Sequence, residues 1–194
     1  MSVTFDDVCK ARADIKDSVI YTPTVKATRL SIHLGIDLYF KLENLQHTSA
    51  FKARGALNKL LTLSDEERKK GVIACSAGNH AQGVAYNATR LGIPSVIVMP
   101  HGTPFNKIKR TEDFGAKVVL HGKSFDESVA FTMQMAEDED MTFIHPFDDE
   151  AVVAGQGTLG LELMEQVPDI DVVVVPIGGG GLIAGVATAV KGIN

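Results

Sequence analysis

Residues 71–99, GVIACSAGNHAQGVAYNATRLGIPSVIVM, carry the pattern that decides the fold class. Two apolar runs rich in β-branched residues, 71–75 and 95–99, stand at the ends of this stretch. Between them, apolar residues recur at helical spacing at Ala81, Val84, Ala85, Ala88 and Leu91. Strands that are apolar on both faces and joined by a crossover helix are typical of a parallel sheet covered on both sides. The stretch therefore predicts a β-α-β unit of an α/β protein.

The same alternation continues toward the C-terminus. Further strands are predicted at Lys117–Leu120, Met141–Ile144 and Asp171–Val175, and a helix is predicted around residues 125–136. We therefore expect open parallel sheets with helices on both faces. The strand at Asp171–Val175 is expected to be central and flanked on both sides, because it is apolar throughout.

The residues before 71 follow a different pattern. They predict a polar helix at Asp6–Lys16, an extended piece with a proline at Tyr21–Val25 and a strand at Asp37–Leu42. A polar loop at residues 43–50 and a helix at residues 51–60 are predicted to follow. No repeat or Gly/Ser linker separates this part from the rest. Any second lobe is therefore expected to be inserted within the sheet order.

The composition is that of an ordinary globular chain. Of 194 residues, 45% are apolar and 22% are charged, which excludes disordered, collagen-like and coiled-coil classes and allows one domain or two small lobes. The 19 Lys and Arg residues against 24 Asp and Glu residues give a net charge of −5. We expect no nucleic-acid partner, because a basic face for a phosphate backbone is missing.

The cysteines, the N-terminus and a long uncharged run bear on the compartment of the protein. Cys9 and Cys75 occur in different contexts, which fits neither a disulfide scaffold nor a zinc site, so reduced thiols and no metal are expected. The N-terminus, Met1–Asp7, is acidic where a signal peptide would be basic. Residues 172–190 lack charges, but Pro176 and four glycines interrupt them. That run predicts strand, turn and helix, not a membrane span.

The strongest signal for a binding site is the loop formed by Gly178, Gly179, Gly180 and Gly181, between an apolar run and a predicted helix. In such a loop, free backbone N–H groups converge at the positive end of a helix dipole, which suits a phosphate. Glycine also allows close approach and positive φ. The alternative is a tight strand-to-helix turn that binds nothing.

Two well-known phosphate loops fit this segment poorly. A Walker loop is excluded because no Lys-Ser or Lys-Thr follows the glycines. Gly179, Gly181 and Ala184 satisfy G-x-G-x-x-A, but that dinucleotide pattern normally opens the first βαβ unit, whereas here it comes late. The glycines alone therefore leave the ligand open.

A second small-residue loop, Ser76-Ala77-Gly78-Asn79-His80, follows the first predicted strand and precedes a helix. Backbone N–H groups at a helix start can bind a carboxylate, which makes an anion site the favoured interpretation. His80 as a catalytic base is less favoured, because a lone histidine is more often structural. Ser76 as a hydrolase nucleophile is least favoured, because no G-x-S-x-G elbow surrounds it.

Lys52 stands beside Phe51 at a junction between loop and helix. Taken alone, such a lysine is usually solvated. In a partly apolar site, however, the pKa of the amine falls and the amine can attack a carbonyl group. An aldehyde-reactive amine, a phosphate loop and a carboxylate loop together describe pyridoxal phosphate acting on an amino acid.

Four motifs, in this order, resemble the threonine/serine dehydratases of the tryptophan-synthase-β-like fold. They are Phe51-Lys52-x-Arg54-Gly55-Ala56, Ser76-Ala77-Gly78-Asn79-His80-Ala81-Gln82-Gly83, Ala154-Gly155-Gln156-Gly157-Thr158 and Gly178 to Gly181. The resemblance runs from about residue 5 to residue 194. It is more specific for the family than for the substrate.

The resemblance implies that pyridoxal 5'-phosphate is the cofactor, bound covalently by Lys52 beside Phe51. It implies that Asn79 bonds the ring hydroxyl, that Ser76 to His80 hold the substrate carboxylate, and that Gly178 to Gly181 hold the phosphate. The implied reaction converts L-threonine or L-serine to 2-oxobutanoate or pyruvate and ammonia, in isoleucine biosynthesis or threonine catabolism, with Lys52 removing the Cα proton. Alternatives are a serine racemase, a hydroxyaspartate dehydratase, or a truncated noncatalytic association module.

Three features bear on how far the resemblance extends. The family commonly has Arg-Thr-Gly-Ser before Phe-Lys, whereas this chain has His47-Thr48-Ser49-Ala50, which lacks the glycine and the last hydroxyl. Similar enzymes also continue beyond Asn194, and the residue that bonds the pyridine nitrogen is expected there. Similar serine racemases have a serine at the position of Ala77, whose methyl group cannot deliver a proton. Elimination without appreciable racemisation is therefore expected.

The resemblance implies a smaller lobe of residues 54–148 and a partial larger lobe of residues 1–53 and 149–194. Because the strand at Asp171–Val175 would then expose an unpaired edge, we expect the 194-residue chain to be a fragment of a longer enzyme or to pair with another chain. The expected partners are an amino-acid substrate and copies of the chain in a dimer or tetramer, without membrane association. The expected location is the cytoplasm.

Overall fold

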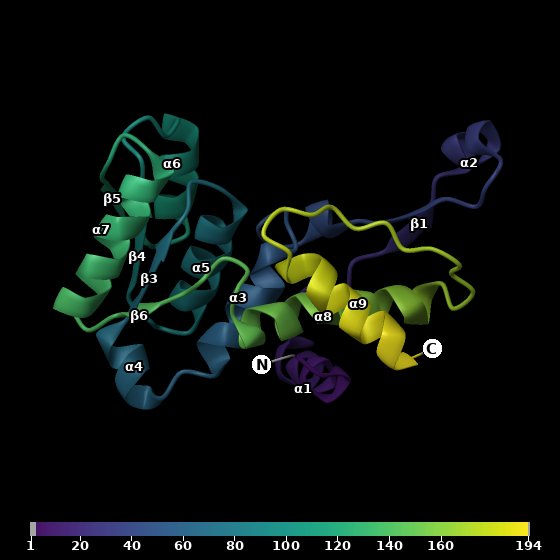
Figure 1. The fold of residues 1–194 in the computed structure, drawn as a ribbon, viewed down its shortest axis with the longest axis horizontal. Coiled ribbons are helices and arrows are strands. Elements are labelled where there is room, and N and C mark those ends of the chain that lie inside the picture. The colour runs from purple at the N-terminus through teal and green to yellow at the C-terminus, as the bar shows by residue number, and fades with distance from the viewer. Residues whose placement is uncertain (1–2, 194) are drawn as a thin grey trace.

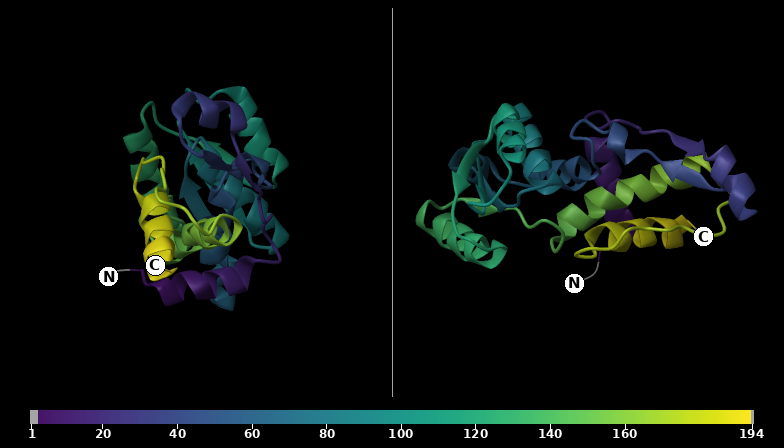
Figure 2. Two further views of the ribbon diagram at one scale, coloured as in Figure 1. Left: turned by 90° about the vertical axis from the view of Figure 1, so that its right-hand side faces the viewer. Right: turned by 90° about the horizontal axis from the view of Figure 1, so that it is seen from above.

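The structure is a computed structural model that describes residues 3–193. A four-stranded parallel sheet with its helices forms one end of an elongated molecule (Figure 1). A helical group and a two-stranded arm form the other end, and the view from above shows the same separation (Figure 2). The expected α/β class is confirmed.

The parallel sheet has the strand order β5-β4-β3-β6. Its strands are β3 (Val72–Cys75), β4 (Ser95–Met99), β5 (Lys117–Leu120) and β6 (Thr142–Phe143). Every residue of β3 and β4 is buried, which is what continuous apolar runs predict for central parallel strands. The predictions of these four strands are confirmed.

Helices cover both faces of this sheet, as expected. They are α4 (Asp65–Lys70), α5 (Asn79–Arg90), α6 (Phe105–Asp113) and α7 (Phe125–Asp138). The predicted apolar stripe of α5 packs against Val72, Ala74, Ile97 and Met99 on one face. The other face presents Ile73, Val96 and Val98 to α7. The two core clusters follow from the alternation of side chains along each strand.

The helical group consists of α1 (Phe5–Ile15), α3 (Lys52–Leu61), α8 (Glu150–Gln166) and α9 (Gly181–Ile193). The sequence predicted α1 and α3. Helix α8 was not predicted, and it lies at the centre, with α1, α3 and α9 packed around it. Its Gly157 lies against Gly185 of α9, where an added Cβ would come within 2.8 Å of the Gly185 carbonyl oxygen. The Ala154–Thr158 motif therefore contributes to close helix packing.

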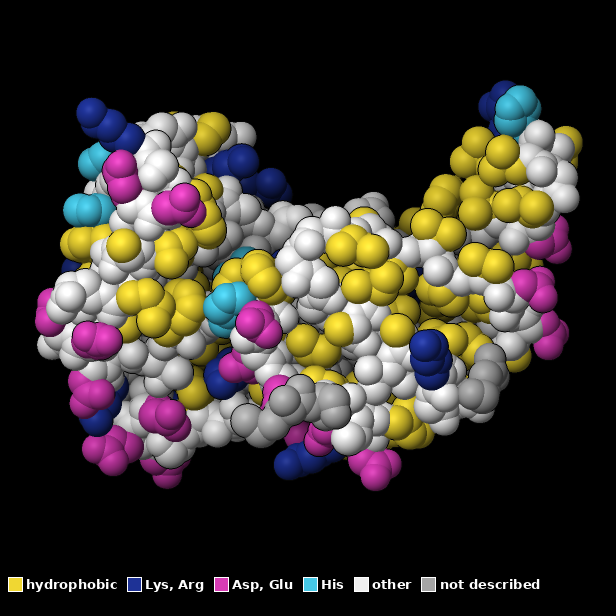
Figure 3. Space-filling view, viewed as in Figure 1, with side chains coloured by type: hydrophobic (Ala, Val, Ile, Leu, Met, Phe, Trp, Pro, Cys, Tyr) yellow, Lys and Arg dark blue, Asp and Glu magenta, His cyan; other side chains and the backbone are white. Residues whose placement is uncertain are grey.

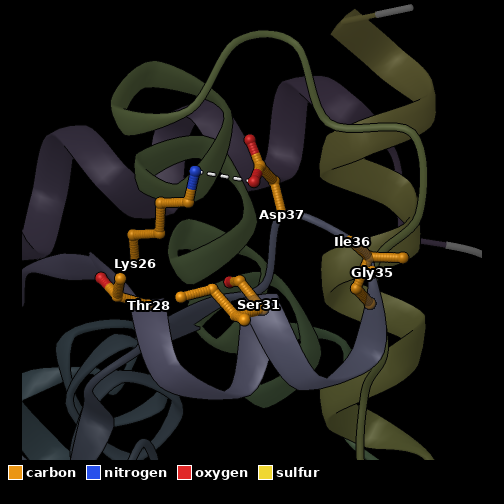
Figure 4. A pocket seen from close by; sticks show the side chains of 7 residues that line it. Lys26, Thr28, Ser31, Gly35, Ile36 and Asp37 are labelled. Atoms are coloured by element: carbon orange, nitrogen blue, oxygen red, sulfur yellow. Dashed lines mark ion pairs between the residues drawn. The ribbon is translucent and has the colours of Figure 1, made fainter.

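The arm consists of β1 (Thr24–Lys26), α2 (Thr28–Leu34) and β2 (Tyr39–Lys41), followed by the 3₁₀ turn η1 (Glu43–Leu45). The two strands are antiparallel, and β2 confirms the strand predicted in this region. Helix α2 was not predicted. A shallow pocket lies against α2, where Lys26 forms an ion pair with Asp37 at 2.6 Å (Figure 4). This pocket lies at the end of the molecule away from the parallel sheet (Figure 1).

The strand predicted at Asp171–Val175 is wrong for this structure. The segment forms no strand and pairs with no strand among residues 3–193. The side chains of Val172 and Val174 are 77% and 89% exposed, where burial on both faces was expected. A β-strand requires a neighbour to satisfy its backbone hydrogen bonds, so an apolar sequence alone does not produce one.

Candidate functional site

Lys52 is the first residue of α3, and its amine points into the interior of the candidate site. Its Nζ donates a hydrogen bond to the carbonyl oxygen of Pro146 at 2.5 Å. The same Nζ lies 5.4 Å from the centre of the Phe51 ring. Burial lowers the pKa of the Lys52 amine, which favours the uncharged, nucleophilic form. The sequence predicted this shift from the apolar neighbour.

A buried ionic network holds the start of α3 in place. Arg54 is fully buried, and its guanidinium bonds Glu43 at 2.8 Å and Glu162 of α8 at 2.6 Å. Burial opposes the charge, but the hydrogen bonds that the guanidinium donates to both carboxylates raise the pKa of Arg54 overall. Lys41 of β2 also pairs with Glu162 at 2.6 Å. The network therefore ties the arm, α3 and α8 together beneath Lys52.

The start of α5 lies directly against Lys52. A Cβ added at Gly83 would be 3.1 Å from the Lys52 backbone, a tight contact, so the small size of glycine helps the two helices to approach this closely. His80 in the first turn of α5 is buried, and its Nε2 bonds the carbonyl oxygen of Ile144 at 2.9 Å. Burial lowers the pKa of His80 to about 4, so the ring is neutral near pH 7. A neutral, hydrogen-bonded ring fits the structural interpretation of His80 better than a catalytic base.

Ser76, Ala77 and Gly78 form the connection from β3 to α5. All three are partly buried, and Ser76 Oγ accepts the backbone N–H of Gly78 at 3.2 Å. Asn79 is exposed as the first residue of α5. The N–H groups of a first helical turn lack partners within the helix, so this end of α5 can accept an anion.

The glycine loop forms the start of α9, on the other side of the same region. Gly180 has a φ of +91°, a conformation that favours glycine. A Cβ added at Gly178 or Gly180 would meet no atom within 4 Å, so both positions border open space. Gly179 and Gly181 instead pack against Phe147, where a Cβ would come within 2.3 Å and 2.6 Å of its atoms.

Residues 145–148 join these parts, because Pro146 contacts Lys52 and Phe147 contacts the glycine loop. The sequence motifs did not include this segment. A signal was present, since residues 145–148 follow a predicted strand, and ligands of open α/β sheets bind beyond the carboxyl ends of strands. The structure thus brings Lys52, the start of α5 and the glycine loop around one turn.

The unusual loop before Lys52 keeps a glycine-like conformation. Ser49 has a φ of +57°, at the position where the family commonly has glycine. Ala50, which replaces the expected serine, is buried. Thr48 is also buried, and its Oγ1 has no hydrogen-bond partner among the described residues. A ligand that supplies an acceptor or donor here would satisfy that hydroxyl.

The donor set fits pyridoxal phosphate. Lys52 offers an amine with a lowered pKa for the aldehyde, and the open faces of Gly178 and Gly180 leave room for a phosphate at the start of α9.

Within residues 3–193, no group of three His, Cys, Asp or Glu side chains is placed to hold a metal ion. Of the helices that the structure describes, none combines the length and apolarity needed to cross a bilayer.

Fold and site together define a class of α/β proteins in which a half-buried lysine lies near two helix starts that have the geometry to accept anions. The chain belongs to the family of pyridoxal-phosphate dependent enzymes, whose family model matches residues 15–194. Its structure superposes on serine racemase from maize with a TM-score of 0.97 at 40% identity, over 100% of this chain and 59% of that one. The structure of threonine deaminase isoform 2 from Solanum lycopersicum superposes with a TM-score of 0.92 at 45% identity, over 99% of this chain and 57% of that one.

Curated relatives agree with this assignment. The L-threonine ammonia-lyase of Thermotoga maritima is 50% identical over 192 residues, which are 99% of this chain and 48% of that protein. The catabolic L-threonine dehydratase of Escherichia coli is 47% identical over 194 residues, which are 100% of this chain and 59% of that protein. The chain therefore spans about half to three fifths of the length of these relatives.

Proposed function

We propose that this chain provides the cofactor and substrate sites of an ammonia-lyase that converts L-threonine and L-serine to 2-oxobutanoate or pyruvate and ammonia. The observation that carries the proposal is the half-buried amine of Lys52, which bonds the Pro146 carbonyl oxygen in the turn that also contacts the glycine loop. The names of the relatives that are nearly half identical support the choice of substrate.

Each part of the site would have one task. Lys52 would hold the cofactor covalently, Phe51 would pack beside it, and Gly178 to Gly181 would bind its phosphate at the start of α9. Asn79 would bond the ring hydroxyl. Ser76 to His80, including Ala77 and Gly78, would hold the substrate carboxylate through backbone N–H groups. The cofactor phosphate and the substrate carboxylate would each be bound at a helix start, which would fix the orientation of the substrate relative to the cofactor.

The reaction then depends on proton transfer by Lys52. Bound pyridoxal phosphate supplies an electron sink for the bond that is broken at Cα. Lys52 Nζ would accept the Cα proton, because its lowered pKa brings the amine closer to neutral pH. The Pro146 carbonyl, which accepts a hydrogen bond from Nζ, would keep the amine at a fixed place between proton transfers.

We also propose that the chain is divided into a lobe of residues 54–148 and a second lobe of residues 1–53 and 149–194. Helix α3 lies at the boundary of this division, because it packs against α5 at the sheet and against α8 in the helical group. Lys52 would then lie where the lobes meet, which is a common place for ligand sites.

We further propose that the protein forms a dimer or tetramer of identical chains in the cytoplasm. Exposed apolar side chains on the arm, such as Ile32 at 79%, support association. Cys9 and Cys75 form no disulfide, which is consistent with a reducing compartment.

Trapping the lysine tests the proposed function. After reconstitution with pyridoxal phosphate and borohydride reduction, peptide mapping should place the pyridoxyl group on Lys52. Lys52→Ala should abolish both the cofactor absorbance and turnover, because the amine and the base are lost together. Lys69→Ala, at an exposed position of α4, is the matched control and should change neither.

Two results would contradict the proposal. An adduct on Lys41 or Lys59 in place of Lys52 would show that the wrong amine was assigned. A chain that takes up no pyridoxal phosphate, even as the full-length protein, would favour the noncatalytic association module.

Serine racemase is the second candidate, because the maize racemase superposes with a TM-score of 0.97. Racemisation requires a proton donor on the face of the substrate opposite Lys52. This chain has Ala77 where similar racemases have serine, and Ala77 packs against the core of the sheet. A hydroxyaspartate dehydratase would catalyse the same kind of elimination on a different substrate, so Ala77 does not distinguish it. The names of the relatives favour L-threonine as the substrate, so elimination from L-threonine and L-serine is the preferred proposal.

We expect the full-length enzyme to release pyruvate from L-serine without D-serine at a comparable rate. Ala77→Ser should increase D-serine relative to pyruvate, because it restores a hydroxyl next to the carboxylate loop. Chiral chromatography of the products measures this ratio. D-serine formation by the unsubstituted enzyme at the rate of pyruvate release would favour the racemase.

A further inference from the structure

His145 shapes the turn of residues 145–148 that joins the parts of the candidate site. Its Nδ1 accepts the backbone N–H of Asp148 at 2.6 Å and that of Phe147 at 3.2 Å. Both bonds require an Nδ1 that carries no proton. None of the sequence motifs contains His145, and the proposed reaction assigns it no task.

Two aromatic rings fix the orientation of this imidazole. The Phe143 ring lies 5.9 Å away at an interplanar angle of 82°, and the Phe147 ring lies 4.7 Å away at 83°. Such edge-to-face contacts favour one ring orientation over others. Nδ1 is therefore held toward the two backbone N–H groups that it accepts.

The turn also sets two contacts of the site. The carbonyl oxygen of Pro146 accepts the hydrogen bond from Lys52 Nζ. The ring of Phe147 lies against Gly179, and its backbone lies against Gly181. If the turn opened, the amine and the glycine loop would lose their support together.

We propose that His145 is a positioning residue, whose unprotonated Nδ1 folds residues 145–148 into the turn that holds Lys52 Nζ and supports the Gly178–Gly181 loop. This inference rests on the proposed function and deepens it, because it couples the amine to the phosphate site through one imidazole. His145 itself touches neither the cofactor nor the substrate in this assignment.

The charged groups around His145 give the turn a pH dependence. Burial has the largest effect and lowers the pKa of His145, the carboxylates of Asp148 and Asp149 raise it, and Lys52 lowers it. His80 is the other titratable group nearby, and its ring is neutral near pH 7. Protonation of Nδ1 would remove both acceptor bonds, so the turn should open as the pH falls.

Paired substitutions test the role of the acceptor atom. His145→Ala removes it, whereas His145→Asn places Oδ1 where it can accept the same N–H groups, as in an Asx turn, and does not titrate. Amide hydrogen exchange at residues 147 and 148 should be about tenfold faster in His145→Ala. It should be within about twofold of the unsubstituted protein in His145→Asn. As the pH is lowered below the ordinary imidazole range, and after correction for intrinsic rates, the exchange rate at these amides should rise further only in the unsubstituted protein, because neither variant has a titratable group at position 145.

A second readout links the turn to Lys52. With limiting pyridoxal phosphate and borohydride reduction, His145→Ala should carry about tenfold less pyridoxyl group on Lys52, and His145→Asn the normal amount. Unchanged exchange in His145→Ala would overturn the proposal, and so would faster exchange with undiminished labelling. If the unsubstituted full-length protein takes no label, the proposed function fails, and the exchange data alone then support or overturn the role of His145 in the turn.

Discussion

His80 shows how one buried side chain can make stability depend on pH. Its ring lies in the first turn of α5 and bonds the Ile144 carbonyl oxygen, so α5 is tied to the end of β6. Burial lowers its pKa from 6.5 to about 4. Between about pH 6.5 and pH 4, His80 therefore binds a proton in the unfolded chain but not in the folded chain. Stability from this source is complete above pH 6.5 and is lost as the pH falls toward 4.

We therefore expect the free energy of unfolding to fall by about 3 kcal/mol between about pH 6.5 and pH 4 because of His80. His80→Gln, whose amide can still donate to Ile144, should lose most of this dependence. His33→Gln, at an exposed position of α2, is the control and should keep it. Urea unfolding at a series of pH values measures the slope. Equal slopes for the unsubstituted protein and His80→Gln would show that His80 does not titrate in this way.

At the scale of elements, the crossing of α8 and α9 decides where the glycine loop lies. A Cβ added at Gly185 of α9 would be 2.3 Å from the carbonyl oxygen of Val153, and one added at Gly157 of α8 would be 2.8 Å from that of Gly185. Backbone atoms at these distances cannot move aside without shifting a whole helix. The close approach of α9 to α8 also places Gly179 and Gly181 against Phe147.

Gly185→Ala should lower the free energy of unfolding by at least about 2 kcal/mol, because the overpacking exceeds the gain in helix propensity. It should also weaken binding of pyridoxal phosphate, because the start of α9 moves with the helix. Ala184→Ser, at an exposed position of the same helix, should change stability by less than about 0.5 kcal/mol. Chemical denaturation compares the two variants. A Gly185→Ala protein as stable as the control would show that the helices can separate at little cost.

At the scale of the whole molecule, apolar surface gathers on the half that holds α8, α9 and the arm (Figure 3). Val172, Val174 and Ile177 are 77%, 89% and 68% exposed, and the segment that contains them pairs with no described strand. Patches of this kind favour association with another surface. A segment with unpaired backbone groups adds hydrogen-bonding partners to that tendency.

We expect the 194-residue chain, taken alone, to self-associate and to release little or no ammonia from L-threonine. Replacing Val172 and Val174 together by threonine should shift its sedimentation toward the monomer. Phe125→Ser, which alters an exposed apolar residue on α7, is the control and should leave association unchanged. A well-behaved monomer with full activity would contradict this expectation.

The sequence by itself determined the local elements. Alternating β-branched runs and helical stripes are consequences of burying one face of each segment, so β3, β4, β5, β6, α5 and α7 could be predicted from spacing alone. Residue chemistry likewise placed Lys52 at a loop-to-helix junction and two small-residue loops at helix starts. What these residues do stays a proposal, because spacing does not show which loops meet.

Only the tertiary structure decided which segments come together. Arg54 pairs with Glu162, which is 108 residues away, and Lys52 bonds Pro146, which is 94 residues away. The turn at His145 depends on hydrogen bonds and ring contacts that no periodicity encodes. Conversely, the apolar run at residues 171–175, which the sequence predicted to be a central strand, has no partner strand among residues 3–193. Local periodicity reports which face of a segment is buried, whereas hydrogen bonds between distant backbones depend on where the folded chain places each partner.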